Sequence, residues 1–454
     1  MKLNRTLWVV VAAVSFSLIS SSAMCATWYV RPEGSKVTLP ANGSTIGNAF
    51  AGLASIPWGG KGVQPGDTVI LTREASDPTS FTGLMTIGAS GTAALPILVK
   101  ADPANHVPIS PSKTSYFAIT ATGQSWINIQ GITTTGAAGG VFLTNCSNVI
   151  ISGCTILGGS FDGVRLVGGG SITVTGCTCT GSGVNGIALV GTATNRLSNC
   201  IVSNNTVSGC LGSDGITLHE SNDANCYPIG TGNQVIGNIS HDNVARGLDI
   251  TSGTGTLVAG NRTYRNNLGG ATIYHDANLV TFTSNYSSSE QGLLLGGPGN
   301  DTISENVFNS GNSVPIWVGQ GSNHVVSNNV FISSASGHSL PTVAIVGGQN
   351  ITFQKNVIYN SNAGGFLLSI TCGTTLTQNI AFNDNCWFQP GSVTVPTIVM
   401  NVIGQGSYQK FMSLGYMASN NLFTNPQLLS DFDIGSSSAA AGQQIGITIV
   451  VNGA

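Results

Sequence analysis

The chain has 454 residues, only 7% of them charged, and a formal net charge of -3 at pH 7. So sparse a charge excludes the basic surface on which nucleic-acid binders depend, so we expect no nucleic-acid partner. The 61 glycines would suit a disordered chain, but the regularly spaced β-branched residues between them indicate short strands instead.

The first residues predict a segment that directs export. Two basic residues precede an apolar run from Leu7 to Ile19, and small residues follow it. This is the layout of a secretory signal, and the run is too short for a membrane span. Cleavage after Ala23 and cleavage after Ala26 both fit. We assign residues 1–26 to a signal peptide and expect a secreted protein (extracellular, periplasmic or on the cell surface) with no membrane span in the mature chain.

A short segment that ends in an apolar residue, Asn or Cys recurs about every 23 residues, which is the period of a repeat architecture. The recurring positions are Ile132, Cys154, Cys177, Asn205, Asn238, Asn261, Asn285, Asn306, Asn329, Asn356 and Asn379. A second apolar strand follows each of them, as in Gly215–Leu218 and Gly247–Ile250. One repeat is too short to bury its own apolar face, so the repeats must stack.

Stacked repeats of this kind predict a parallel β-coil in which each turn of chain pairs with the turns above and below it, about 4.8 Å away. Asn tolerates the left-handed backbone of a tight corner, and its amide can bond to the same amide one turn along. We therefore expect an all-β, single-stranded parallel β-helix with an asparagine ladder at one corner. Cys154 and Cys177 stack at that corner, either as a disulfide or as two buried thiols.

The two ends of the chain carry segments of their own: Thr27–Gly34, Pro65–Leu71, Leu422–Pro426 and Ser436–Ala439. With these segments and the repeat, the chain resembles the secreted right-handed parallel β-helix proteins, a family typified by polysaccharide lyases. The resemblance implies a right-handed β-helix of about eleven or more coils, present as a monomer. It implies an N-terminal cap with the first coils at 27–120, central coils at 121–385, and the last coils with a closing segment at 386–454.

In-register stacking places residues of successive coils in columns. The column before the turn glycine holds Asp162, Asn185, Asp214 and Arg246. The outward column of the following strand holds Arg165, Ala188, Thr217, Asp249, Thr272, Leu294 and Trp317. Two positions further on are Val167, Val190, His219, Thr251 and Tyr274, with Glu220 and His275 next along. The longest insertion follows His219, and long loops beside a rigid sheet build binding clefts.

These columns carry the residue types that β-elimination from an acidic, uronate-containing polysaccharide requires. A cation neutralises the uronate carboxylate, and a basic side chain accepts the neighbouring proton. Ca²⁺ prefers several oxygen ligands, for which Asp214, Asp249 and Asp242 are the candidates. Arg246 or His219 would be the base, and Asp214 belongs to the same catalytic group. The expected partner is an extracellular polysaccharide, and its candidate contacts are Arg165, Asn185, Glu220, Tyr274, His275 and Trp317.

The same region resembles the calcium site in the ninth family of pectate lyases. Three of that family's motifs occur in order, at Asp214–Gly215, Gly230–Asn233 and Gly247–Asp249. The resemblance implies a Ca²⁺-dependent lyase. Ala245 and Arg246 stand where the family has adjacent acids, and no lysine lies between Lys113 and Lys355 to serve as the family's base.

Other interpretations of the charged residues stay open. Asp214 with Arg246, and Asp242 with Arg265, would also fit plain ion pairs on the wall of the coil, which contribute about 0 to 1 kcal/mol when exposed.

Two other functions also fit the columns. Hydrolysis needs two carboxyl groups across a glycosidic bond, and the pairs Asp214 with Asp249 or Asp162 with Asp214 would supply them. A non-catalytic carbohydrate-binding or adhesive surface needs only an aromatic and apolar platform, for which the candidates are Trp317, Tyr274 and Leu294.

Overall fold

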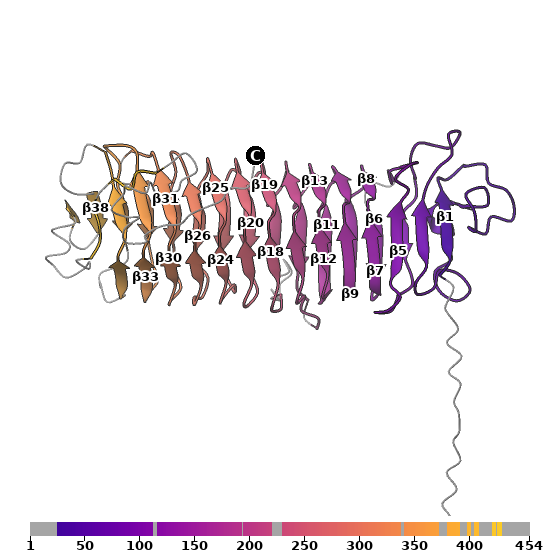
Figure 1. The fold of residues 1–454 in the computed structure, drawn as a ribbon, viewed down its shortest axis with the longest axis horizontal. Coiled ribbons are helices and arrows are strands. Elements are labelled where there is room, and N and C mark those ends of the chain that lie inside the picture. The colour runs from indigo at the N-terminus through magenta and orange to yellow at the C-terminus, as the bar shows by residue number, and fades with distance from the viewer. Residues whose placement is uncertain are drawn as a thin grey trace, which may run out of the picture.

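A computed structural model describes residues 25–111, 116–192, 194–219, 229–336, 340–371, 379–390, 397–400, 404–407, 420–423 and 425–428. The chain winds into a right-handed parallel β-solenoid of about 14 turns, as the sequence predicts, and Figure 1 shows the strands stacked along one long axis. Among the described residues no helix is long and apolar enough to cross a membrane. The signal peptide expected at 1–26 lies almost wholly outside the described residues.

Each complete coil contributes up to three short strands, so the solenoid has three faces. Face 1 runs along most of the stack: β4 (Met85–Ile87), β6 (Phe117–Thr122), the first part of β9 (Gly139–Ser152), β11 (Val164–Gly170), β14 (Ile187–Val190), β17 (Ile216–His219), β20 (Arg246–Ile250), β23 (Gly269–Ile273), β26 (Leu293–Leu295), β29 (Ile316–Val318), β32 (Val343–Ile345), β35 (Leu368–Ile370) and β38 (Thr397–Met400). A last strand, β39 (Gly404–Ser407), pairs antiparallel with β38.

Face 2 begins in the N-terminal cap and continues along the whole stack: β1 (Thr27–Arg31), β3 (Thr68–Leu71), β5 (Ile97–Ala101), β7 (Ser125–Gln130), the second part of β9, β12 (Thr173–Thr175), β15 (Ile201–Ser203), β18 (Gln234–Ile236), β21 (Leu257–Ala259), β24 (Thr281–Thr283), β27 (Thr302–Ser304), β30 (Val325–Ser327), β33 (Ile351–Gln354) and β36 (Ile380–Asn383). Within the cap, β2 (Phe50–Ala51) also pairs with β1, and a 3₁₀ turn, η1, spans Leu53–Ser55.

Face 3 is a separate sheet: β8 (Thr133–Thr135), β10 (Thr155–Leu157), β13 (Thr178–Thr180), β16 (Thr206–Ser208), β19 (Ile239–His241), β22 (Arg262–Tyr264), β25 (Tyr286–Ser288), β28 (Val307–Asn309), β31 (Val330–Ser333), β34 (Val357–Asn360) and β37 (Cys386–Phe388). Apart from β38 with β39, the pairings between named strands are parallel. Alternate side chains of every face point into one continuous core, where aromatic rings stack from coil to coil, as Phe308 does on Phe331 with ring centroids 5.5 Å apart.

The asparagine ladder is confirmed at the corner between faces 2 and 3. Its members are Asn205, Asn238, Asn261, Asn285, Asn306, Asn329, Asn356, Asn385 and Asn421. Both the backbone N–H and the side-chain Nδ2 of Asn261 donate to Asn285 Oδ1, each at 2.9 Å, and Nδ2 also donates to the Val235 carbonyl at 2.8 Å. Every amide in the ladder is therefore satisfied inside the core, where an unpaired one would be costly.

Two details of the ladder differ from the prediction. The left-handed residue at the corner is the one before each ladder asparagine, such as Gly260 at φ 63° and Ser284 at φ 55°, so the asparagine itself is selected for its hydrogen bonds. Asn379 is not a member, because Asn356 bonds to Asn385 instead. Asn379 belongs to a second, exposed ladder with Asn300, Asn323 and Asn350.

The cysteines near this corner are thiols. Cys154 and Cys177 lie in adjacent coils, as expected, and both are buried and unbridged. Cys210 is also a buried thiol. By sequence position Cys210 and Cys226 flank the inserted loop and Cys372 and Cys386 flank a later one, so either pair could form a disulfide, but Cys226 and Cys372 lie outside the described residues.

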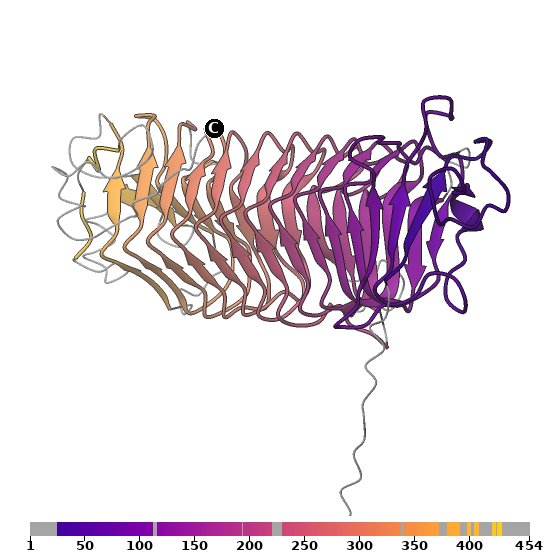
Figure 2. The same cartoon turned by 45° about the vertical axis from the view of Figure 1, so that its right-hand side comes forward.

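The first coil is closed by a cap that holds a buried ion pair. Arg31 is fully buried, and its guanidinium donates to both carboxylate oxygens of Asp77, from Nε at 2.6 Å and from NH2 at 2.5 Å. Burial alone would raise the pKa of Asp77, but the hydrogen bonds from Arg31 and the Glu74 backbone hold it below its usual value. The loops of the cap extend past the stacked coils (Figure 2).

Candidate functional site

The predicted columns on face 1 are confirmed by the strand register. Arg165 pairs with Ala188, Ala188 with Thr217, and Thr217 with Asp249. The same column continues through Thr272 and Leu294 to Trp317. The neighbouring column brings Val190 beside His219, and the Thr251 N–H donates to the Leu218 carbonyl, which places Thr251 next along.

The outward column of face 1 is buried where the acids lie. Ile216, Leu218, Leu248 and Ile250 fill the core side of β17 and β20, so Thr217 and Asp249 point away from the core. Even so, Thr217 is only 3% exposed, Asp249 8% and Thr272 2%. A polar stripe on the outside of the coil is thus shielded from water around Asp249.

Burial and a neighbouring charge bring the pKa of Asp249 close to neutral pH. Its environment raises its pKa from an ordinary 3.8 to about 7, first because of burial and then because of the negative charge of Asp214. Arg246 and hydrogen bonds from Thr217 and Thr251 oppose the shift without cancelling it. The Thr217 hydroxyl donates to Asp249 Oδ2 at 3.3 Å. This carboxyl is therefore poised to hold or release a proton.

The column before the turn glycine forms a short polar ladder of its own. Asp162 Oδ1 accepts both the backbone N–H and the Nδ2 of Asn185, at 3.0 and 2.9 Å. Asn185 Oδ1 accepts the backbone N–H of Asp214, and Asp214 Oδ1 accepts the backbone N–H of Arg246 at 2.8 Å. The Ser213 hydroxyl donates to the other oxygen of Asp214 at 2.9 Å. Asp214 is thus fixed by hydrogen bonds to backbone and hydroxyl groups, and it meets Arg246 through the arginine's backbone.

The remaining predicted contacts lie around this centre. Arg165 is anchored, because its NH1 donates to Asp162 Oδ2 at 2.6 Å. His219 Nδ1 lies 3.2 Å from Thr251 Oγ1, and its imidazole is half-buried beside the acids. Tyr274 is half-buried, and its ring meets that of His275 edge on, with centroids 4.7 Å apart. Glu220 lies outside the described residues.

Trp317 and Leu294 belong to the column but lie further along it. Trp317 is three strand pairings from Asp249, which corresponds to about 14 Å along the axis at about 4.8 Å per coil. Both side chains are half-buried. They extend the same face toward the C-terminal end.

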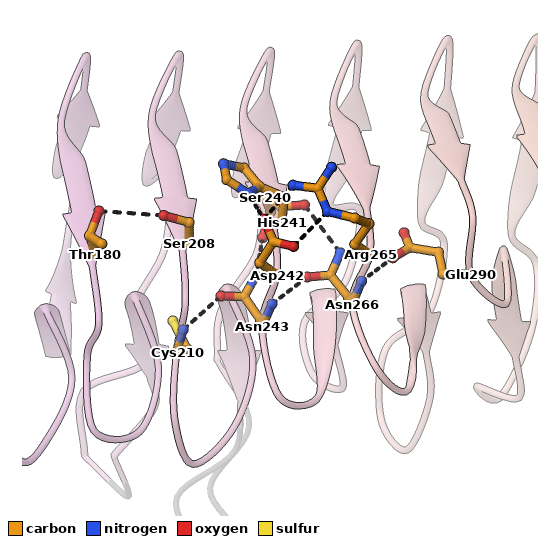
Figure 3. A network of polar contacts seen from close by, with 10 residues as sticks. All are labelled: Thr180, Ser208, Cys210, Ser240, His241, Asp242, Asn243, Arg265, Asn266 and Glu290. Atoms are coloured by element: carbon orange, nitrogen blue, oxygen red, sulfur yellow. Dashed lines mark hydrogen bonds and ion pairs between the residues drawn. The ribbon is translucent and has the colours of Figure 1, made fainter.

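Asp242 does not join the acids of face 1. It lies at the corner that follows β19, where Arg265 donates to both its oxygens at 2.6 Å and His241 Nδ1 lies 2.6 Å from Oδ2 (Figure 3). These contacts hold the pKa of Asp242 well below its usual range. The predicted set of Asp214, Asp249 and Asp242 is therefore not assembled. Among the described residues no group of three His, Cys, Asp or Glu side chains could hold a metal ion.

The alternative interpretation of Asp242 and Arg265 as an ion pair on the wall of the coil is the one that the geometry bears out. Both residues have left-handed backbones, each at φ 55°, as Gly209 has at φ 64° one coil earlier. His241 stacks flat on Tyr264, with centroids 4.6 Å apart, and Arg265 covers the same tyrosine.

Glu290 is a buried acid that the sequence analysis missed. Below the Asp242 corner, the Cys210 N–H donates to Asn243 Oδ1, Asn243 donates to Asn266 Oδ1, and the Asn266 N–H donates to Glu290 Oε2 at 2.5 Å (Figure 3). Burial raises the pKa of Glu290 to about 7 despite these hydrogen bonds. The signal for it was present, since Glu290 follows Asn266 by the same repeat that separates Asn266 from Asn243.

Comparisons with known structures give remote likenesses. The lacto-N-biosidase of Eubacterium ramulus is 13% identical, with a TM-score of 0.49 over 80% of this chain and 67% of that one. The pectate lyase Pel9A is 14% identical, with a TM-score of 0.39 over 91% and 83% of the two chains. The surface adhesin PfbA of Streptococcus pneumoniae is 12% identical, with a TM-score of 0.45 over 75% and 86%. A search of curated proteins finds no match.

Unlike these remote likenesses, one family model matches the sequence itself. The model of the right-handed beta helix region matches residues 117–287 and 269–403, which together span most of the stacked coils. The right-handed stack of parallel strands agrees with this match. The chain therefore belongs to the right-handed beta helix family.

Proposed function

We propose that the protein acts on an extracellular polysaccharide, which binds along face 1 and is cleaved beside Asp249. The observation that carries the proposal is the pairing of Asp249, whose pKa lies close to neutral pH, with Asp214, whose negative charge raises that pKa. Perturbed carboxyl pairs of this kind are typical of sites that move protons. Arg246 opposes the pKa shift of Asp249 by its charge, and His219 lies on the neighbouring strand β17. Arg165 extends the same face three coils toward the N-terminus, so the face offers cationic groups and an imidazole.

The first candidate reaction is β-elimination at a uronate. A protonated Asp249 and the guanidinium of Arg246 would neutralise the uronate carboxylate by hydrogen bonding and charge. His219 would then accept the proton on the carbon beside that carboxylate, and the electron pair of the broken C–H bond would form the double bond. The glycosidic oxygen would leave with the electron pair of its bond to the sugar and take up a proton from the imidazolium of His219 or from water. This assignment keeps His219 as the base and uses Arg246 for neutralisation, because a guanidinium stays protonated in proteins.

Calcium does not fit this arrangement. Ca²⁺ takes six to eight oxygen ligands, typically from several ionised carboxylates. Here Asp242 is bound by Arg265 at another corner, so only two of the three predicted carboxylates, Asp214 and Asp249, lie on face 1. The elimination proposed above accordingly relies on the side chains of face 1 and includes no metal-bound step.

The second candidate is hydrolysis, which the two carboxyl groups favour directly. Asp249 would protonate the glycosidic oxygen, and Asp214 would act as base or nucleophile on the other side of the sugar. The substrate would then need no uronate.

One substitution separates the two candidates. Purified protein and Asp249→Asn are incubated with polygalacturonate, alginate and neutral glucans, and both unsaturated ends and reducing ends are followed. Asn keeps a neutral hydrogen-bond donor but has no proton to give. Elimination predicts that Asp249→Asn retains activity within about tenfold, while hydrolysis predicts a loss of at least a hundredfold. If neither product forms on any substrate while the polysaccharide is still retained, the protein is a binding module and the proposed cleavage is wrong.

A further inference from the structure

A second candidate site lies in the N-terminal cap. A cavity of about 580 Å³ is lined by Trp28, Asn42, Ser44, Phe50, Pro57, Gly59, Lys61 and Gly62. Its walls come from β1, β2 and the two loops that flank β2 and η1. None of these residues belongs to the columns of face 1.

The aromatic wall of this cavity is held in one orientation. The Trp28 indole Nε1 donates to Asp67 Oδ2 at 2.8 Å, so its only polar atom is satisfied on the side of the core. The Trp28 ring stacks on Phe50 with centroids 5.8 Å apart, and it is half-buried. Gly43, at φ 74°, lies so close to Phe50 that a Cβ there would come within 2.4 Å of its ring. A rigid aromatic surface of this kind costs little entropy on binding.

The polar side of the cavity offers hydrogen-bond donors and a positive charge. Asn42 Oδ1 accepts from both the backbone N–H and the hydroxyl of Ser44, at 3.1 and 2.7 Å, which turns the amide so that its oxygen is used internally. Lys61 is exposed at the rim, and no carboxylate of the described residues forms an ion pair with it. Asn42 and Lys61 therefore present hydrogen-bond donors and a positive charge to the cavity.

We propose that this cap cavity binds an acidic sugar unit of a polysaccharide, with the sugar's apolar face on Trp28, its hydroxyls at Asn42 and its carboxylate at Lys61. The aromatic surface, the amide and the cation match the three chemical parts of a uronate ring. The cavity volume lies in the range of small-molecule sites. The site binds without reacting.

The cap cavity is remote from Asp249. From β1 to β18, the strand that precedes β20 in its coil, there are seven successive pairings along face 2. This separation corresponds to about 34 Å at about 4.8 Å per coil, and Figure 1 shows β1 at one end and β20 near the middle. Only a long chain can contact both sites, so the cap would hold a polysaccharide by a second point of attachment and raise its effective concentration at face 1.

The test uses short uronate oligosaccharides, which cannot span both sites. Trisaccharides of galacturonate and of mannuronate, and a neutral galactose trisaccharide, are titrated at low salt while tryptophan fluorescence and heat of binding are recorded. Lys61→Glu should weaken uronate affinity at least tenfold without shifting the melting temperature. Its matched control is Lys36→Glu, an equivalent charge reversal at another exposed position of the cap, which should leave affinity within twofold. Trp28→Phe should remove the fluorescence change.

Three outcomes would overturn the proposal. Equal affinities of Lys61→Glu and Lys36→Glu would place the ligand elsewhere, and equal binding of the neutral trisaccharide would refute the acidic ligand. The variant Asp249→Asn separates this proposal from the proposed cleavage, because it should bind at the cap like the wild type whatever happens to turnover. Loss of trisaccharide binding in Asp249→Asn would assign the binding to face 1 and refute the cap site.

Discussion

Asp249 is buried one coil away from Asp214, and burial together with that neighbouring charge raises its pKa to about 7. Asp214 itself accepts hydrogen bonds from the Arg246 backbone and the Ser213 hydroxyl. Both carboxyl groups are buried on one face, but their hydrogen bonds differ: Asp214 accepts bonds of 2.8 and 2.9 Å, whereas the bond from Thr217 to Asp249 is 3.3 Å long. This difference is the basis of the first two predictions.

Asp249→Asn should stabilise the protein above neutral pH. The folded pKa of about 7 lies above the ordinary 3.8, so the folded state keeps a proton that the unfolded chain releases between these values. Stability therefore falls as pH rises from about 4 to about 7 and is then level. Since one pKa unit corresponds to about 1.4 kcal/mol, the variant should gain a few kcal/mol at pH 8 over the wild type and almost nothing at pH 4. Denaturant unfolding at both pH values measures it, and equal gains would refute the raised pKa.

Activity should follow the same ionisation. Both candidate reactions use the protonated form of Asp249, so kcat/KM should decline as pH rises through about 7, the value to which its environment raises its pKa. If elimination operates, the descending limb should disappear in Asp249→Asn, because the amide cannot ionise. The measurement is a pH profile on the best polysaccharide substrate. A wild-type profile that keeps rising from pH 6 to pH 9 would contradict the role given to Asp249.

Glu290→Gln should preserve the ladder it ends and remove its pH dependence. Glu290 accepts the Asn266 N–H and the Ser287 hydroxyl, and its pKa is raised to about 7 by burial. The amide oxygen of Gln can accept the same bonds without a buried charge. The variant should be more stable than the wild type at pH 8, by roughly 1 to 3 kcal/mol, and similar at pH 4. Turnover on any substrate should not change, because the carboxyl of Glu290 is buried against Asn266 and Ser287 and does not line the outer surface of face 1.

Asn285→Ala should be strongly destabilising. Asn285 Nδ2 donates to Asn306 Oδ1 and the Val258 carbonyl, and its Oδ1 accepts from Asn261. Removing the amide leaves several buried groups unsatisfied, at about 1 to 3 kcal/mol each, so a loss of roughly 2 to 5 kcal/mol is expected. Thermal and denaturant unfolding measure it.

The matched control is Asn323→Gly in the exposed ladder. Asn323 bonds to Asn300 at 3.1 Å in contact with solvent, and glycine tolerates its left-handed φ of 57°. Water can replace the lost bonds, so the loss should stay below about 1 kcal/mol. Similar losses for both variants would mean that burial does not decide the strength of the ladder.

Asp77→Ala should open the N-terminal cap. It removes the bidentate partner of the fully buried Arg31 guanidinium, which keeps only the exposed carboxylate of Glu74, 3.0 Å from its NH2. Removing one partner of a buried ion pair typically costs about 3 to 5 kcal/mol. Hydrogen exchange should show the largest loss of protection in β1 and β3, whereas protection of the central coils around β20 should be unchanged. Uniform loss along the solenoid would indicate that the cap and the coils unfold as one unit.

The fold could be predicted from the sequence because each repeat of the sequence forms one coil, and the coils stack at the spacing of the repeat. A spacing of about 23 residues with apolar alternation leaves one way to bury the strands, and it also fixes columns such as Thr217 beside Asp249. The register failed only where an insertion moved it, so that Asn385 and not Asn379 follows Asn356. Sequence spacing alone cannot distinguish two asparagines a few residues apart when both can occupy corners.

The site was predicted less completely. The spacing of the repeats predicts which residues are neighbours in successive coils, but not how deeply they are buried or which other side chains they contact. The sequence left two interpretations of Asp242 open, a calcium ligand and an ion pair with Arg265, and the structure shows the ion pair. The raised pKa values of Asp249 and Glu290 depend on burial, which no spacing reveals. The cap cavity depends on loops between β1 and β3 that carry no repeat at all.

The side-chain amides of Asn238, Asn261 and Asn285 bond from one coil to the next in the same geometry, so each coil offers its neighbours the same hydrogen-bonding partners at this corner. Any whole turn could be excised or duplicated between two such amides, and the flanking ones would still find a partner at the same height. The length of the molecule is therefore an independently adjustable property, and the distance between the cap cavity and Asp249 can be changed in steps of one turn without redesigning either.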